Sequence, residues 1–253
     1  MVYAYTGTKP IVAGQRTAMF LHGAGNDHSV WALQSRYFAY HRFNVLAVDL
    51  PGHGKSSGPA LATVEEMSQW AVRVLDAAGI ERAALIGHSM GSLVALEAAA
   101  HHAQRVEKLV LIGTAFPMKV SDALLSAAQA HDHAAVDMIN VWSHSPTGQI
   151  GGNRAPGLWI MGGSMRLLER TAAPLYEDFN ACNRYASGPQ SAAKVSCPAL
   201  VISGSRDLMT PARAAQSIAA ALADCKTIVL DGSGHDLMTE QPDAVLDALI
   251  AFL

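Results

Sequence analysis

The sequence predicts an α/β protein in which a mostly parallel central sheet is flanked by helices and carries an inserted helical segment. Short apolar runs alternate with helix-like segments, and one long stretch interrupts this alternation. The chain has 253 residues, of which half are hydrophobic and only 15% are charged, against about 25% in soluble domains generally. That length suits one large domain with a sizeable core, or one domain with an insertion.

Six short apolar runs are predicted to be strands buried on both faces. Most of them lack the in-and-out alternation of a half-exposed strand, and each is closely followed by Gly, Asp or Ser. Continuous apolar runs of this length are typical of parallel strands that helices cover on both sides. The predicted strands are residues 18–21, 43–48, 83–86, 106–112, 199–202 and 227–230.

Helix-like segments separate most of these strands. Thr63 and Glu66 form a capping-box pattern, and Pro211 and Pro242 suit a first helical turn. Alternating strands and helices predict an open sheet with right-handed crossovers. The predicted helices are residues 63–78, 91–103, 211–223 and 241–253.

The stretch from about residue 114 to 195 breaks this rhythm. It is richer in Met, His, Trp and Gly, and its helical pieces near 121–141 and 160–186 flank a loop-like segment at 143–153. Connections inside compact domains are usually short, and long ones are usually functional. We therefore expect residues 114–195 to be a helical cap or lid, inserted into a core formed by residues 1–113 and 196–253.

Composition and charge argue against several classes of protein. The formal net charge of −3 does not indicate binding to nucleic acid or to an anionic membrane, which would need an excess of positive charge. No stretch approaches the roughly 18 apolar residues of a membrane span, and the N-terminus lacks the pattern of a signal peptide. Three cysteines without CxxC spacing predict reduced thiols. We expect a cytoplasmic protein without a nucleic acid or membrane partner, whose oligomeric state the sequence does not indicate.

The strongest local signal is the run Gly87-His88-Ser89-Met90-Gly91. It is a G-x-S-x-G pattern placed after a predicted strand and before a predicted helix, which is the context of a nucleophile elbow. A sharp turn of this kind needs an awkward backbone, and the flanking glycines remove the Cβ atoms that would clash. The turn is predicted to present Ser89 at the carboxyl edge of the sheet, where open α/β sheets bind ligands.

A serine hydroxyl becomes a strong nucleophile only when a base takes its proton. His235 lies in a glycine-rich loop after the last predicted strand, which makes it the candidate base. Asp207 follows the strand before it and is the candidate for the acid that orients the imidazole. Asp231 and Asp236 are closer in sequence, but neighbours in sequence rarely reach the far side of the ring. The sequence thus predicts a Ser89–Asp207–His235 triad.

Two further glycine-containing loops follow predicted strands. In the run from Phe20 to Gly25, glycines let backbone N–H groups approach a ligand, and we interpret the N–H groups of Ala24 and Met90 as an oxyanion hole. The segment 49–56 is interpreted as a structural turn. The glycine-rich loops match neither a P-loop nor a dinucleotide fingerprint, so no cofactor is expected, and no metal site is predicted.

The runs HGAG, DLPGHGKS, GHSMG, SGSRDLMTP and GSGHD follow one another in this order. They resemble the α/β-hydrolase superfamily, in its lid-bearing serine esterase-like group, over about residues 18–113 and 195–253. The resemblance implies the α/β-hydrolase fold with an inserted helical cap. It also implies Ser89 as nucleophile, His235 as base, Asp207 as acid, and Ala24 and Met90 as oxyanion donors.

The leading hypothesis is a serine carboxylesterase that cleaves a small or medium apolar ester through an acyl-enzyme, so the expected partner is a small ester-like molecule. The same triad also serves lactone or enol-lactone opening, C–C cleavage and cofactor-free perhydrolysis, and these alternatives stay open. A non-catalytic ligand-binding protein on the same fold is the remaining alternative. Candidates for a substrate pocket in the cap are Trp142, Trp159, Met161 and Met165, for which plain packing is an equal interpretation.

Overall fold

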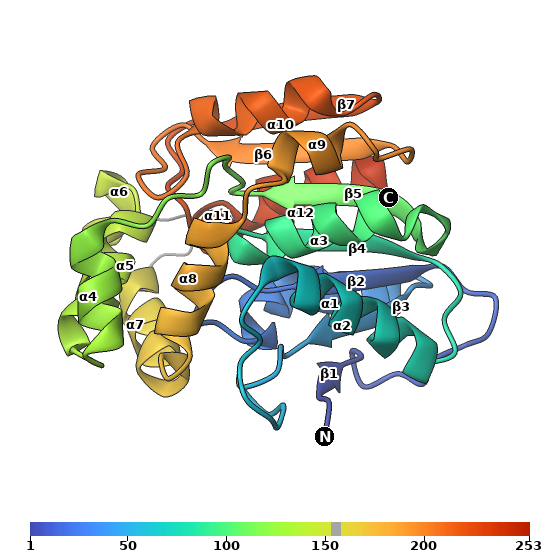
Figure 1. Cartoon of the computed structure of the whole chain (residues 1–253), viewed down its shortest axis with the longest axis horizontal. Helices are drawn as coiled ribbons and strands as arrows, with labels where there is room; N and C mark the ends of the chain where they lie inside the picture. Colours follow the sequence, from blue (N-terminus) through green and yellow to red (C-terminus); the bar gives the residue numbers. More distant parts are fainter. Residues whose placement is uncertain (153–157) are drawn as a thin grey trace.

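In the computed structural model, which describes residues 1–152 and 158–253, seven strands form one sheet in the order β1-β3-β2-β4-β5-β6-β7 (Figure 1). β1 is antiparallel to β3, and the other neighbouring pairs are parallel. The strands are β1 (Ala4–Tyr5), β2 (Thr17–Leu21), β3 (Asn44–Val48), β4 (Ala83–His88), β5 (Val106–Ile112), β6 (Ala199–Gly204) and β7 (Cys225–Leu230). The predicted mostly parallel sheet is confirmed.

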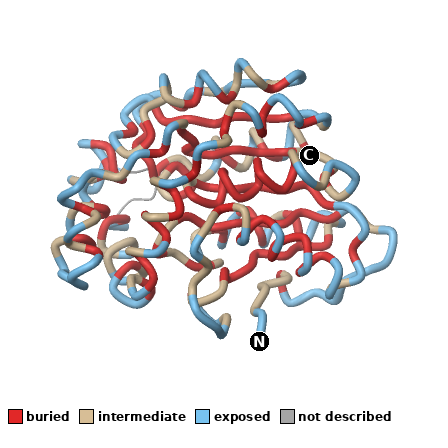
Figure 2. Tube along the Cα trace, in the orientation of Figure 1, coloured by how far each residue is buried: buried red, intermediate tan, exposed pale blue. Residues whose placement is uncertain are grey.

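The middle strands are buried on both faces because their side chains alternate between two apolar clusters. In β2, Met19 and Leu21 belong to one cluster, whereas Ala18 and Phe20 belong to the other. This alternation follows from the two-residue period of a strand, and burial of both faces explains the continuous apolar runs. Figure 2 shows the sheet as the most continuously buried part of the chain. The prediction of burial on both faces is wrong for β7, which is half-exposed because it lies at the edge of the sheet.

Helices cover each face of the sheet. The cluster that contains Met19 is completed by α2 (Val64–Ala77) and α3 (Met90–His101), and the cluster that contains Phe20 by α1 (Ala32–Tyr40) and α12 (Pro242–Phe252). The predicted cap of α2 is present, since Thr63 Oγ1 accepts from Glu66 N at 3.1 Å. The segment 211–223, predicted as one helix, forms a 3-10 turn (Ala212–Ala215) followed by α10 (Gln216–Ala221).

The stretch between β5 and β6 is helical. It contains α4 (Asp122–Gln129), α5 (His133–Ser143), α6 (Pro146–Gln149), α7 (Ile160–Thr171), α8 (Leu175–Arg184) and α9 (Gly188–Ala192). Figure 1 shows α4 to α7 grouped at one end of the sheet. Helices α4, α5, α7 and α8 share an apolar cluster, against which Ala24 and Met209 from loops of the sheet also pack. We call α4 to α8 the inserted helices; residues 153–157 of the predicted cap, including the end of the predicted loop 143–153, lie outside the described residues.

The three cysteines, Cys182, Cys197 and Cys225, are free. Among the helices that the structure describes, none is both long and apolar enough to cross a bilayer.

Candidate active site

Ser89 lies on the sharp turn between β4 and α3. Its backbone has φ 52° and ψ −121°, a conformation that costs a non-glycine residue about 1–3 kcal/mol and persists only where the surroundings impose it. The surroundings are close backbone: a Cβ at Gly87 would lie 2.1 Å from Gly91 O, and a Cβ at Gly91 would lie 2.3 Å from Leu21 O. In addition, Ser89 N donates to Ile112 O at 2.9 Å. The glycines are therefore required by close packing of the turn.

His235 and Asp207 are buried and in contact, with His235 Nδ1 2.8 Å from Asp207 Oδ2. Thr210 Oγ1 donates to the same carboxylate oxygen at 2.8 Å, and the N–H groups of Met209 and Thr210 donate to the other oxygen at 2.8 and 2.7 Å. Burial alone would raise the pKa of Asp207, but the neighbouring imidazole and these hydrogen bonds hold it below its usual value. The carboxylate is thus ionised and fixed in orientation.

The loop that carries His235 is held by a residue of the inserted helices. Ser143 O, at the end of α5, accepts from His235 N at 2.8 Å and from Asp236 N at 2.9 Å. His88 Nε2 also contacts this loop, at 2.9 Å from His235 O. Burial and the nearby His235 lower the pKa of His88 to about 4, so His88 is neutral and donates through Nε2.

The loop of residues 22–25 lies directly beside Ser89. A Cβ added at Gly23 would lie 3.1 Å from Ser89 Cβ, and Ala24 lines the same cavities as Ser89. Met90 is the first residue of α3, and the first N–H groups of a helix have no partner within it. Both N–H groups predicted to be oxyanion donors thus belong to backbone adjacent to Ser89.

The buried carboxylate of Asp178 joins both this loop and the 49–56 turn to the inserted helices. Asp178 Oδ2, on α8, lies 2.8 Å from His53 Nε2 and accepts from Gly25 N at 2.9 Å. His53 Nδ1 lies 3.0 Å from Pro51 O, so both ring nitrogens face acceptors and both carry protons. Burial would lower the pKa of His53, but the charge of Asp178 and these hydrogen bonds raise it. Sequence reasoning missed Asp178, because no local pattern links a helix of the insertion to a loop more than a hundred residues earlier.

The adjacent His22 has the opposite protonation state. Its Nε2 accepts from Leu50 N at 3.1 Å, which leaves the proton on Nδ1, 2.9 Å from Gly23 O. Burial and the neighbouring His53, whose ring centroid is 4.9 Å away, lower the pKa of His22 to about 4. The charged imidazole of His53 and the neutral imidazole of His22 therefore lie side by side next to the 22–25 loop.

Two cavities meet at Ser89 in the described part of the chain. The larger has a volume of about 440 Å³ and is also lined by His235, and the smaller has about 140 Å³. Of the four candidate pocket residues, Trp159 lines the larger cavity and Trp142 the smaller one. The linings do not include Met161, which is buried, or Met165, which packs against the apolar cluster of the inserted helices.

The larger cavity has a polar group in its wall that sequence reasoning missed. Ser164 Oγ donates to Asp236 Oδ2 at 2.9 Å, and His144 Nε2 lies 3.5 Å from the same oxygen. Burial would raise the pKa of Asp236, but His144 and Ser164 lower it to about 2. The sequence signal for this role is the position of Asp236 directly after His235.

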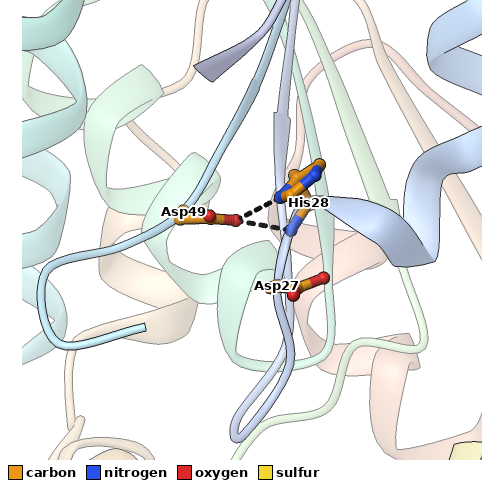
Figure 3. A group of neighbouring side chains, drawn as sticks. All are labelled: Asp27, His28 and Asp49. Carbon is orange, nitrogen blue, oxygen red and sulfur yellow. Dashed lines mark hydrogen bonds and ion pairs between the residues drawn. The ribbon is translucent and has the colours of Figure 1, made fainter. Parts of the chain in front are cut away.

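Figure 3 shows Asp27, His28 and Asp49, whose side chains lie close enough to suggest a metal site. The carboxylate oxygens of this group already interact with other groups of the protein. Asp49 Oδ1 lies 2.7 Å from both His28 N and His28 Nδ1, and its Oδ2 accepts from Lys55 N at 2.8 Å. Asp27 is paired with Arg170 at 2.7 Å. These bonds give the group a structural role in holding the 49–56 turn.

Comparisons with known proteins agree with this architecture. The sequence model of the alpha/beta hydrolase family matches residues 18–248. The (E)-2-((N-methylformamido)methylene)succinate hydrolase of Acinetobacter baylyi is 26% identical, over 93% of this chain and 89% of that protein. The dihydrolipoyllysine-residue acetyltransferase component of the acetoin cleaving system of Cupriavidus necator is 40% identical over 115 residues, which cover 45% of this chain and only 29% of that protein.

Among solved structures, the enol-lactonase from Burkholderia xenovorans LB400 is similar with a TM-score of 0.86 and 25% identity, over 99% of this chain and 95% of that one. The sheet order, the turn at Ser89 and these matches agree on one architecture, the α/β-hydrolase fold that the sequence motifs predicted. Because the family match spans most of its length, the chain is a member of the alpha/beta hydrolase family.

Proposed function

We propose that this protein is a serine hydrolase that cleaves small or medium carboxylic esters through an acyl-enzyme intermediate. The observation that carries the proposal is the 2.8 Å contact between His235 Nδ1 and Asp207 Oδ2, because His235 and Ser89 line the same cavity. Asp207 keeps the proton on Nδ1, which leaves Nε2 free to act as the base for Ser89. In this proposal the inserted helices form the cap of the site.

The reaction then has two displacement steps. Ser89 Oγ attacks the ester carbonyl carbon while its proton passes to His235, and the N–H groups of Ala24 and Met90 stabilise the oxyanion. One such donor is typically worth about 10²–10³ in rate. His235 next gives its proton to the departing alcohol, which leaves an acyl group on Ser89. A water molecule, deprotonated by His235, releases the acid and restores the serine.

Lactone hydrolysis is a second candidate, favoured by the similarity to the enol-lactonase over nearly the whole chain. A lactone is a cyclic ester, so the same groups serve the same steps. The two activities differ in whether the leaving group stays attached to the acyl group, and a parallel panel of esters and lactones distinguishes them.

The test is hydrolysis of short p-nitrophenyl esters by the purified protein and by the variant Ser89→Ala. Wild type is expected to release p-nitrophenol and to be labelled by a fluorophosphonate at Ser89. The variant is expected to lose at least about 10³-fold in kcat and all labelling, because the nucleophile is removed. Equal hydrolysis by the two proteins would overturn the assignment.

A further inference from the structure

The two cavities that meet at Ser89 differ in size and in lining. Ser89 and Ala24 line both of them, and so do Phe179 and Met209, which therefore lie along their boundary. A substrate with its carbonyl at Ser89 thus has two directions in which to extend. An ester has two parts on either side of the carbonyl carbon, the acyl chain and the alcohol. Each part can therefore occupy one of the two cavities.

We propose that the acyl group occupies the smaller cavity and the departing alcohol the larger one, so that the substrates are short-chain esters of larger, hydrogen-bonding alcohols. This inference rests on the proposed function. It follows from the place of His235, since the group that protonates the leaving oxygen must come within hydrogen-bond distance of it.

His235 lines the larger cavity and is not among the described residues that line the smaller one. The smaller cavity approaches His235 through Thr210, whose Oγ1 lies 3.0 Å from Nδ1. That nitrogen already faces Asp207, so a leaving oxygen in the smaller cavity would meet the wrong side of the imidazole. The alcohol must therefore leave through the larger cavity.

The volume of the smaller cavity limits the acyl group. It measures about 140 Å³, and an apolar cavity of about 150 Å³ is known to hold a benzene ring, which corresponds to roughly six carbon atoms. The walls suit an apolar chain: burial raises the pKa of the Cys182 thiol, which is therefore neutral, and Lys119 directs its ammonium group to Asn183 O. The site is expected to accept acyl groups up to about hexanoyl or benzoyl in size.

The larger cavity suits a bigger leaving group, and its mostly apolar wall offers that group one polar contact. Its volume is about 440 Å³, and Asp236, Ser164 and His144 form a hydrogen-bonded group in its wall. A hydroxyl or amide on the alcohol can exchange hydrogen bonds with this group, whereas the described lining of the smaller cavity offers no such carboxylate.

The inference is tested with two ester series. In the first, the acyl chain of p-nitrophenyl esters is lengthened from two to twelve carbons. In the second, the acyl group is held at butanoyl while the alcohol is lengthened and given a terminal hydroxyl, with acid release followed by pH-stat titration. We expect kcat/KM to fall about tenfold or more once the acyl chain exceeds roughly six carbons, because it overpacks the cavity. Lengthening of the alcohol is expected to cause no such loss.

Two matched variants test which cavity limits the length of the acyl chain. Leu124 and Leu168 are both buried in the apolar cluster of the inserted helices, but Leu124 lines the smaller cavity and Leu168 the larger. Leu124→Ala is expected to move the acyl limit to longer chains, whereas Leu168→Ala leaves it unchanged. Leu208→Ala offers the same enlargement at an exposed residue of the smaller cavity, which keeps the test available if Leu124→Ala does not fold.

The outcomes separate the two proposals. Absence of hydrolysis in both series, together with absence of fluorophosphonate labelling, overturns the proposed function and with it the inference. Active enzyme that tolerates long acyl chains but rejects long alcohols overturns only the assignment of the cavities. An acyl limit that Leu168→Ala moves as much as Leu124→Ala also contradicts it.

Discussion

The turn at Ser89 shows how a single backbone position can depend on its neighbours. Its left-handed conformation is unfavourable for serine, and it is maintained because β4, α3 and the end of β2 approach so closely that side-chain atoms are excluded. A Cβ at Gly91 would lie 2.3 Å from Leu21 O and 2.6 Å from His22 O. Both contacts are with backbone, which cannot move aside without displacing β2 and the 22–25 loop.

Gly91→Ala is therefore expected to lower the free energy of unfolding by at least about 2 kcal/mol, the range of backbone strain and overpacking. Urea unfolding of the wild type and the variant measures this change in the free energy of unfolding. The control is Gly163→Ala in α7, where an added Cβ meets nothing within 4 Å; there the change is expected to stabilise by about 0.4–1 kcal/mol. Similar effects of the two substitutions would show that close packing of the turn is not what requires Gly91.

Asp207 orients the imidazole of His235 in the proposed reaction. Because its carboxylate is fixed by Thr210 and Met209 and holds the proton on His235 Nδ1, Asp207→Asn is expected to lower kcat by about 10⁴-fold with little change in KM. Asp231→Asn, a change of the same kind in an exposed residue of the loop before His235, is the control and is expected to keep kcat within about twofold. A loss in Asp207→Asn of less than about tenfold would contradict the role assigned to Asp207.

At the scale of elements, the inserted helices were predicted as helical, but each predicted helix is divided. The piece 121–141 is interrupted between α4 and α5, where His131 has φ 52° and Asp132 caps α5 by accepting from Ala134 N at 2.9 Å. The helix α1 escaped prediction because it buries Gln34 and Ser35, so its sequence has no apolar stripe. Helix ends and buried polar positions depend on tertiary contacts, which periodicity does not contain.

Helix α8 is tied to the 49–56 turn by the His53–Asp178 pair, and this tie depends on pH. The folded-state pKa of His53 is raised, so the stability that the pair contributes is fully present below the unfolded value of about 6.5 and is lost as pH rises through the folded value. Asp178→Asn removes this contribution and is expected to cost about 3 kcal/mol at pH 6, because it leaves a buried histidine without its counter-charge.

Urea unfolding of wild type and Asp178→Asn at pH 6 and pH 9 checks this prediction. The difference between the two proteins is expected to be smaller at pH 9. Arg170→Ala is the control, because it removes another ion pair between the insertion and the core, Arg170–Asp27, in which the aspartate is buried and the arginine is exposed. Neither group titrates between pH 6 and pH 9, so the cost of Arg170→Ala is expected to be the same at both pH values. A difference that grows from pH 6 to pH 9 would contradict the charged state assigned to His53.

At the scale of the whole molecule, the sheet and the three proposed triad positions could be predicted because their signals are local. Buried parallel strands have continuous apolar runs. Ser89 and Asp207 each follow such a run, and His235 follows the half-exposed strand β7, whose second half is apolar. The residues that hold the site together could not be predicted. Asp178, Ser143 and Glu240 contact segments that are far from them in the sequence, and a buried carboxylate in a helix looks like any surface acid in the sequence.

Glu240 in α11 (Leu237–Glu240) illustrates how the molecule is joined. Its buried carboxylate accepts from Gly234 N at 3.0 Å, in the loop before His235, and from Ser145 N at 3.0 Å, at the start of α6. One side chain thus binds the core and the insertion together. We infer that the inserted helices open only with the loss of this and the similar ties made by Asp178 and Ser143.

Glu240→Gln is therefore expected to let the insertion open without unfolding the sheet. Oε1 can keep the bonds from Gly234 N and Ser145 N, but an amide nitrogen in place of Oε2 cannot accept the bond that Ser145 Oγ donates to the carboxylate. Hydrogen exchange of backbone amides measures this local opening. Exchange in α5 and α6 is expected to accelerate about 10-fold or more, while the amides of β4 and β5 keep their protection. Glu169→Gln is the control, since the partners of this exposed carboxylate, Arg166 and His133, both belong to the insertion. Equal acceleration in β4, β5 and the inserted helices would instead mean that core and insertion form one cooperative unit, whose opening does not depend on these ties.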